Sequence, residues 1–88
     1  MIVMDMEMSG LDPEKNGIVS IGAIDLNNPS ETFYGECHIE DDEEIFQGIP
    51  GNPDARPVTE VNGFTEEQMR DKSTMSQKEL LEKFIHWL

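Results

Sequence analysis

The sequence opens with Met1-Ile2-Val3-Met4-Asp5-Met6-Glu7-Met8, an apolar run interrupted by two acids. Methionines flank Asp5 and Glu7 at every second position, a period that is typical of a β-strand. Since alternate side chains of a strand point to the same face, the two carboxylates share one face, with Cα atoms about 6 to 7 Å apart. We therefore predict a mostly buried strand over residues 1–8 that carries paired acids.

Two further apolar, β-rich runs follow, at residues 18–26 and 32–39. Turn-forming residues separate the three runs, at Gly10–Pro13, Asn16-Gly17 and Asn27–Ser30. Short turns between successive strands predict an antiparallel meander. Gly22 and Gly35 lie inside the second and third runs, where a glycine indicates a bulge or the close approach of another element.

The second half favours helices. Residues 40–57 are acidic, then rich in Pro, Gly and Asn, and predict a surface loop. Thr65 with Gln68, and Ser76 with Glu79, have the spacing of capping boxes, which predicts two helix starts. The last helix carries an apolar face of Leu80, Leu81, Phe84, Ile85 and Leu88. The expected fold class is α/β, an antiparallel three-strand meander followed by two helices.

Size and charge limit the function classes. The 88 residues suit one small domain, and 19 acids against 6 bases give a formal charge of −13. Such a charge repels bare phosphate unless divalent ions lie between the acids and the phosphate. The lone Cys37 cannot form an internal disulfide, and neither a signal peptide nor an apolar stretch long enough for a membrane is present. We expect a cytoplasmic protein without membrane contact.

The pair Asp5 and Glu7 needs a compensating charge. No base is near in sequence, the first being Lys15, and two desolvated carboxylates on one face repel each other. Mg²⁺ or Mn²⁺ provides the simplest compensation, because these ions prefer oxygen ligands. A two-metal phosphodiesterase site needs more ligands than two. Spacing alone leaves a second interpretation open, in which both acids are simply the solvated face of an edge strand.

The residues Asp5–Glu14, followed by Ile18–Ala23, resemble the first motif of the DEDD-type 3′-to-5′ exonucleases. Within that group, the sequence of this motif looks most like that of the oligoribonucleases. Val61–Thr65 and Phe84–Leu88 also match that family in order. The resemblance implies a ribonuclease H-like fold. It also implies that residues 1–88 are the N-terminal portion of a single exonuclease domain that stops before the second and third motifs.

By this resemblance, Asp5 and Glu7 are catalytic ligands of a two-metal Mg²⁺ or Mn²⁺ site that hydrolyses phosphodiesters. The backbone around Met8 and Ser9 would meet the terminal nucleotide, and Leu11 would pack against the last base. The implied partner is the 3′ end of a single-stranded nucleic acid, RNA or DNA. Because the remaining aspartates and the general base are absent, we expect the isolated chain to be inactive. For Leu11, a turn residue tucked into the core is an open alternative.

Other polar groups are weaker candidates. His38 with Glu43 imitates the spacing of the family's third motif, but it comes too early in the chain and has Glu in place of Asp. We expect His86 to be solvated on its helix. The acidic run Glu40–Glu44 lacks the ligand spacing and glycine of a calcium loop and predicts a solvated segment.

Two other functions stay open. An acidic interaction module would use the apolar helix face and an open sheet edge to bind a partner or a second copy, forming a homodimer. A haloacid dehalogenase-type phosphatase would use Asp5 as a nucleophile. The phosphatase is less favoured, because Glu7 replaces its second aspartate and the first strand is followed directly by another strand.

Overall fold

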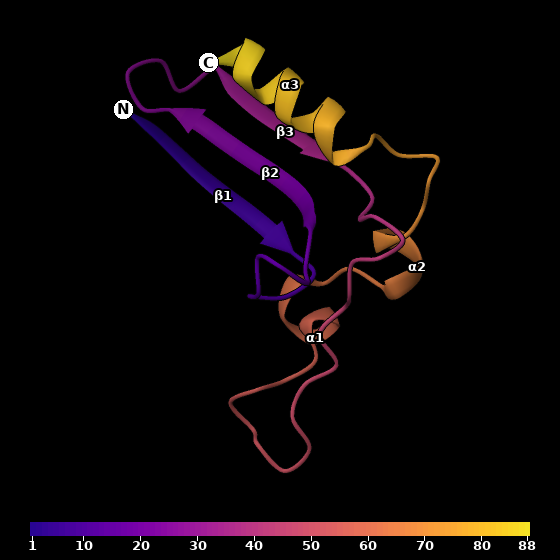
Figure 1. Ribbon diagram of the computed structural model, residues 1–88. Coiled ribbons are helices and arrows are strands. Elements are labelled where there is room, and N and C mark those ends of the chain that lie inside the picture. Colours follow the sequence, from indigo (N-terminus) through magenta and orange to yellow (C-terminus); the bar gives the residue numbers. More distant parts are fainter.

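The computed structural model describes all 88 residues as a three-stranded antiparallel sheet with three helices. The elements are β1 (Ile2–Met8), β2 (Ile18–Asp25), β3 (Thr32–Glu36), α1 (Val58–Asn62), α2 (Glu66–Met69) and α3 (Gln77–Trp87). The strand order is β1-β2-β3, so the predicted meander is confirmed. In Figure 1, α3 lies along β3, β1 forms the opposite edge, and α1, α2 and the long loop extend beyond one end of the sheet.

The core has two parts. One lies between α3 and the sheet and consists of Ile21, Ala23, Cys37, Leu80 and Phe84. The other lies under α1 and α2 and consists of Val19, Ile39, Ile45, Val58 and Met69. Both parts draw on alternate residues of β2, which is why the central strand is the most buried of the three.

Close packing of α3 on β3 depends on Gly35. A Cβ atom at this position would lie 2.5 Å from Cδ1 of Leu80, so only glycine permits the observed approach. The predicted role of this glycine is confirmed. Gly22 differs, because a Cβ there would meet only Tyr34 Cδ1 at 3.7 Å, an ordinary contact.

The expectation of a mostly buried first strand is wrong. Met1 to Met4 are exposed, and only the last part of β1, from Met6 onward, is half-buried. The reason is topological, because β1 is an edge strand and α3 packs over β2 and β3.

The helices and the third strand also depart in part from expectation. Helix α1 falls outside the two predicted helices, and β3 ends at Glu36 before residue 39. Both predicted capping boxes are present, at Thr65 and Ser76. At 11 residues, the longest helix falls short of the length and apolarity that a membrane crossing requires.

The apolar face predicted for α3 is only partly buried. Leu80 and Phe84 pack in the core, while Leu81, Ile85 and Leu88 remain exposed. Trp87, half-buried, stacks near Phe84 with ring centroids 6.1 Å apart. The buried stripe of α3 is therefore narrower than the sequence pattern indicates.

Candidate metal and nucleotide site

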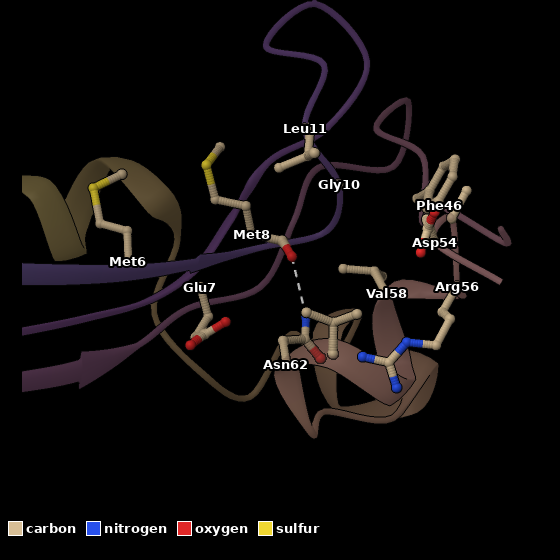
Figure 2. Close-up of a pocket in the computed structure, with 12 residues that line it drawn as sticks. Met6, Glu7, Met8, Gly10, Leu11, Phe46, Asp54, Arg56, Val58 and Asn62 are labelled. Atoms are coloured by element: carbon tan, nitrogen blue, oxygen red, sulfur yellow. Dashed lines mark hydrogen bonds between the residues drawn. The ribbon is translucent and has the colours of Figure 1, made fainter.

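The two acids of β1 point to the face of the sheet opposite α3. Asp5 pairs with Gly22 and Glu7 with Ser20, whereas Met6 pairs with Ile21, a residue of the core beneath α3. Figure 2 shows the Glu7 carboxylate directed away from the side to which Met6 points. The shared face predicted from the spacing of the acids is thus present. Asp5 is exposed and Glu7 is half-buried.

A β-bulge follows immediately. The register shifts between Glu7 and Met8, so that Met8 pairs with Ile18 and Val19 becomes the extra residue on β2. Bulges bend a strand and redirect its side chains, and they are frequent next to active sites. Here the bulge separates the acidic part of β1 from the turn that carries Leu11.

Other polar groups share the uncovered face with Glu7. Tyr34 Oη donates a hydrogen bond to Glu36 Oε2 at 2.8 Å. Partial desolvation of the hydroxyl, then this hydrogen bond and the negative charge of Glu36, raise the pKa of Tyr34 above its ordinary value. The negative charge of Glu7 also raises the pKa of Tyr34, whereas a hydrogen bond with Ser20 lowers it. This face therefore carries a net negative field with no base on it.

The donor chemistry of Asp5 and Glu7 fits a hard divalent ion. Neither carboxylate accepts a protein hydrogen bond, and the one ion pair of the chain joins Lys72 to Asp41 elsewhere. Carboxylate oxygens free of other partners are the ligands that Mg²⁺ and Mn²⁺ prefer. The number of ligands is insufficient, however, because no three His, Cys, Asp or Glu side chains converge anywhere in the chain. Asp5 and Glu7 could thus supply at most two of the protein ligands that a two-metal site requires.

The backbone after Glu7 is firmly held. Ser9 is fully buried; its amide donates to Gly17 O at 2.9 Å and its carbonyl accepts from Phe46 N at 2.8 Å. Its hydroxyl donates to Glu44 O at 2.7 Å and accepts from Gly17 N at 2.9 Å. Every polar group of Ser9 is therefore engaged within the protein. Met8 keeps its side chain at the site, while its carbonyl accepts a hydrogen bond from Asn62 Nδ2 at 3.0 Å.

Leu11 is completely exposed, which excludes the alternative that it is tucked into the core. It overhangs a pocket of about 550 Å³ at the end of β1, shown in Figure 2. The pocket is lined by Met6, Glu7, Met8, Gly10, Leu11, Phe46, Asp54, Ala55, Arg56, Val58, Val61 and Asn62. Its volume is in the range of small-ligand sites, roughly 300 to 1,000 Å³.

One wall of the pocket is the corner between α1 and α2. Asn62 ends α1, ties it to β1 through Met8 O, and accepts a hydrogen bond from Phe64 N at 2.9 Å. Gly63 makes the corner with φ of 77°, a left-handed conformation that glycine adopts without strain. Val61 is left 62% exposed on the pocket side. The stretch Val61–Thr65, which matched the family in sequence, thus lies beside the carboxylate-bearing strand.

The opposite wall comes from the loop before α1. Phe46 is tethered to Ser9 at its amide and to Val58 N at its carbonyl, the latter at 2.9 Å. Arg56, also from this loop, is exposed and lines the pocket. Sequence reasoning missed both residues. One signal was present, because Arg56 is the only base in the acidic stretch from residue 40 to residue 60.

The remaining acids and histidines lie elsewhere. Asp41 pairs with Lys72 at 2.7 Å, and the Lys72 ammonium lowers the pKa of Asp41. Glu43 is half-buried and accepts hydrogen bonds from Glu40 N and from the side chain of Gln77. The acidic run is thus partly tied down rather than simply solvated. His38 Nδ1 lies 3.2 Å from Thr74 O, away from the pocket, and His86 is exposed as expected.

Comparison with known proteins places these observations in a family. A family model described as Exonuclease, of the RNase T type, matches residues 2–88. Two proteins named DNA polymerase III PolC-type, from Thermotoga petrophila and Thermotoga maritima, are each 28% identical over 87 residues. These alignments cover 99% of this chain but only 6% of either relative. The chain, with its carboxylate-bearing edge strand beside a lined pocket, belongs to the exonuclease family.

Proposed function

We propose that the chain contributes the first carboxylate pair and a terminal-base pocket to a divalent-metal-dependent 3′-to-5′ exonuclease with a ribonuclease H-like fold. One observation carries the proposal. Asp5 and Glu7 lie on one face of β1 with no protein partner, and the strand ends at a pocket in a chain of the exonuclease family. The bound ions would polarise the scissile phosphodiester and activate the attacking water.

The protein's own residues divide the remaining tasks. Asp5 and Glu7, in the second half of β1, would hold the ions. Leu11 and Val61, both highly exposed, offer apolar contact to the face of the terminal base. Such contact tolerates any base, as an exonuclease requires. The two relatives are named as DNA polymerases, which favours the 3′ end of single-stranded DNA over RNA as the substrate.

The proposal requires further metal ligands in addition to Asp5 and Glu7. A two-metal site needs more carboxylates than Asp5 and Glu7, and no third ligand converges on them here. As part of the same proposal, the chain is the N-terminal portion of a larger exonuclease domain and is inactive when isolated. A phosphatase built on Asp5 is disfavoured, because β1 runs directly into the antiparallel β2.

The first test is thermal melting of the chain during titration with MnCl₂. When the ion is present at about ten times its dissociation constant, binding adds about 1.4 kcal/mol to the free energy of unfolding. For a domain of this size, that increase raises Tm by about 5 to 10 °C. Asp5→Asn and Glu7→Gln should each abolish most of this shift. Glu82→Gln, which removes an exposed acid of α3, serves as the matched control and should retain it.

Equal shifts in all four proteins would mean general charge screening and would sink the proposed metal site. A second measurement concerns the larger exonuclease domain proposed above. There, Asp5→Asn should abolish release of nucleotides from the 3′ end of single-stranded DNA, and Glu82→Gln should leave the rate unchanged.

A further inference from the structure

The pocket at the end of β1 contains one positive charge in an otherwise strongly acidic protein. Only six of the 88 residues are basic, and Arg56 is the one base among the residues that line the pocket. Its guanidinium forms no ion pair, since the single ion pair of the chain is Lys72 with Asp41. It also donates no hydrogen bond, whereas Arg70 donates to Glu43 O. Arg56 is therefore free to bind an external anion.

The backbone around Arg56 is fixed although its side chain is exposed. Ile49 N donates to Ala55 O at 2.8 Å, which closes the loop immediately before the arginine. Gly48 passes so close that a Cβ atom there would lie 2.8 Å from Ala55 O, with a φ of 85° that glycine alone adopts easily. Pro57 follows with φ of −52°, and Val58 N then donates to Phe46 O. The loop thus presents Arg56 from a defined position.

The surroundings determine which anion fits. Figure 2 shows Asn62 between the Glu7 carboxylate and the Arg56 guanidinium in this view. Glu7 and Asp54 also line the pocket, so a free anion would meet repulsion on two sides. A phosphate within a strand is different, because the same strand brings a base to the apolar residues Leu11 and Val61. A guanidinium is well suited to this partner, since its fork of donors matches two phosphate oxygens.

We propose that Arg56 binds a non-bridging phosphate oxygen of the single strand whose terminal base enters the pocket. The inference rests on the proposed exonuclease function and adds a substrate-binding residue to it. In this arrangement the acids on β1 would bind the metal ions, and Arg56 on the opposite wall would bind the phosphate backbone of the nucleic acid.

The experiment measures fluorescence anisotropy of a 5′-labelled single-stranded oligothymidylate with the chain, in constant MgCl₂ and increasing NaCl. Arg56→Ala should weaken binding about tenfold, as expected for loss of one charge-assisted hydrogen-bonded contact. The slope of log affinity against log salt should fall by about 0.7, the value for one phosphate contact on a single strand. Arg56→Lys should keep the slope while losing part of the affinity, because an ammonium cannot bind in the bidentate manner.

Lys83→Ala is the matched control, since it removes the same charge from an exposed position on α3. It should leave affinity within about twofold and the slope unchanged. Parent-like affinity and slope in Arg56→Ala would overturn the role of Arg56 while leaving the proposed function intact. Absence of saturable binding by the parent chain would overturn the proposed function and, with it, this inference. Equal melting temperatures of all variants exclude a folding defect.

Discussion

At the scale of single residues, Cys37 shows how burial sets chemistry. Its side chain is 2% exposed, and its Sγ donates to Ile18 O at 3.1 Å. Burial, and then the charges of Glu43 and Glu40, raise the pKa of this thiol to about 11. Since the thiolate is the nucleophile, we expect iodoacetamide at neutral pH to alkylate the native chain slower than the urea-unfolded chain by a factor on the order of a hundred.

Equal alkylation rates in the two states would contradict this environment. The same pKa difference links stability to pH. The native pKa lies above the unfolded value of about 8.5, so the contribution is complete below that pH and is lost as pH rises toward 11. Cys37→Ala should flatten this alkaline part of the unfolding free energy, as measured by urea titrations at several pH values.

At the scale of elements, the contact of α3 with β3 makes a sharper prediction. Gly35→Ala places a methyl group 2.5 Å from Leu80 Cδ1, so the helix or the leucine must shift. We expect the free energy of unfolding to fall by about 1 to 3 kcal/mol, the usual cost of overpacking a core. Urea denaturation measures this change.

Gly22→Ala is the matched control, a glycine-to-alanine change in the neighbouring strand. Its nearest neighbour, Tyr34 Cδ1 at 3.7 Å, is at normal contact distance, so stability should be unchanged or slightly higher. Equal destabilisation by both substitutions would mean that the helix does not pack closely at Gly35.

The sequence predicted those strands and helices whose formation depends on residues close together in the chain. The three strands follow from alternation and turns, and the helix starts at Thr65 and Ser76 follow from their capping boxes. Helix α1 gave no such signal, because it has five residues and its first residue follows Pro57 without a side-chain cap. The chain after β3 instead bonds at long range, with Cys37 bridging to Met75. No local pattern encodes such pairing.

The site was predictable to the same extent. Asp5 and Glu7 were found because they lie two residues apart on one strand, and a strand's period fixes their common face. Phe46 and Arg56 lie at the pocket because of how the loop between β3 and α1 folds, with Phe46 N bonded to Ser9 O and Val58 N bonded to Phe46 O. Loop positions of this kind depend on tertiary contacts and carry no periodicity.

At the scale of the whole molecule, the formal charge is −13, so most charges are acids that repel one another. The chain has a single attractive ion pair, the highly exposed Lys72 with Asp41. Self-repulsion therefore outweighs attraction between charges. We expect Tm to rise as NaCl increases from about 0.01 to about 0.5 M, because the Debye length falls from about 30 Å to a few ångströms. Lys72→Gln should show the same trend, since an exposed pair contributes little. A falling Tm would mean that attractive pairs dominate.

The exposed outer edge of β1 has a consequence for anyone handling the protein. An unpaired strand edge with exposed Ile2, Val3 and Met4 can recruit the same edge of another copy and begin fibrillar assembly. Asp5 and Glu7 lie on this strand, so two edges that meet would bring four carboxylates together and be driven apart. Neutralising either acid thus also removes part of the repulsion that prevents aggregation. Every measurement on those variants should therefore be accompanied by light scattering.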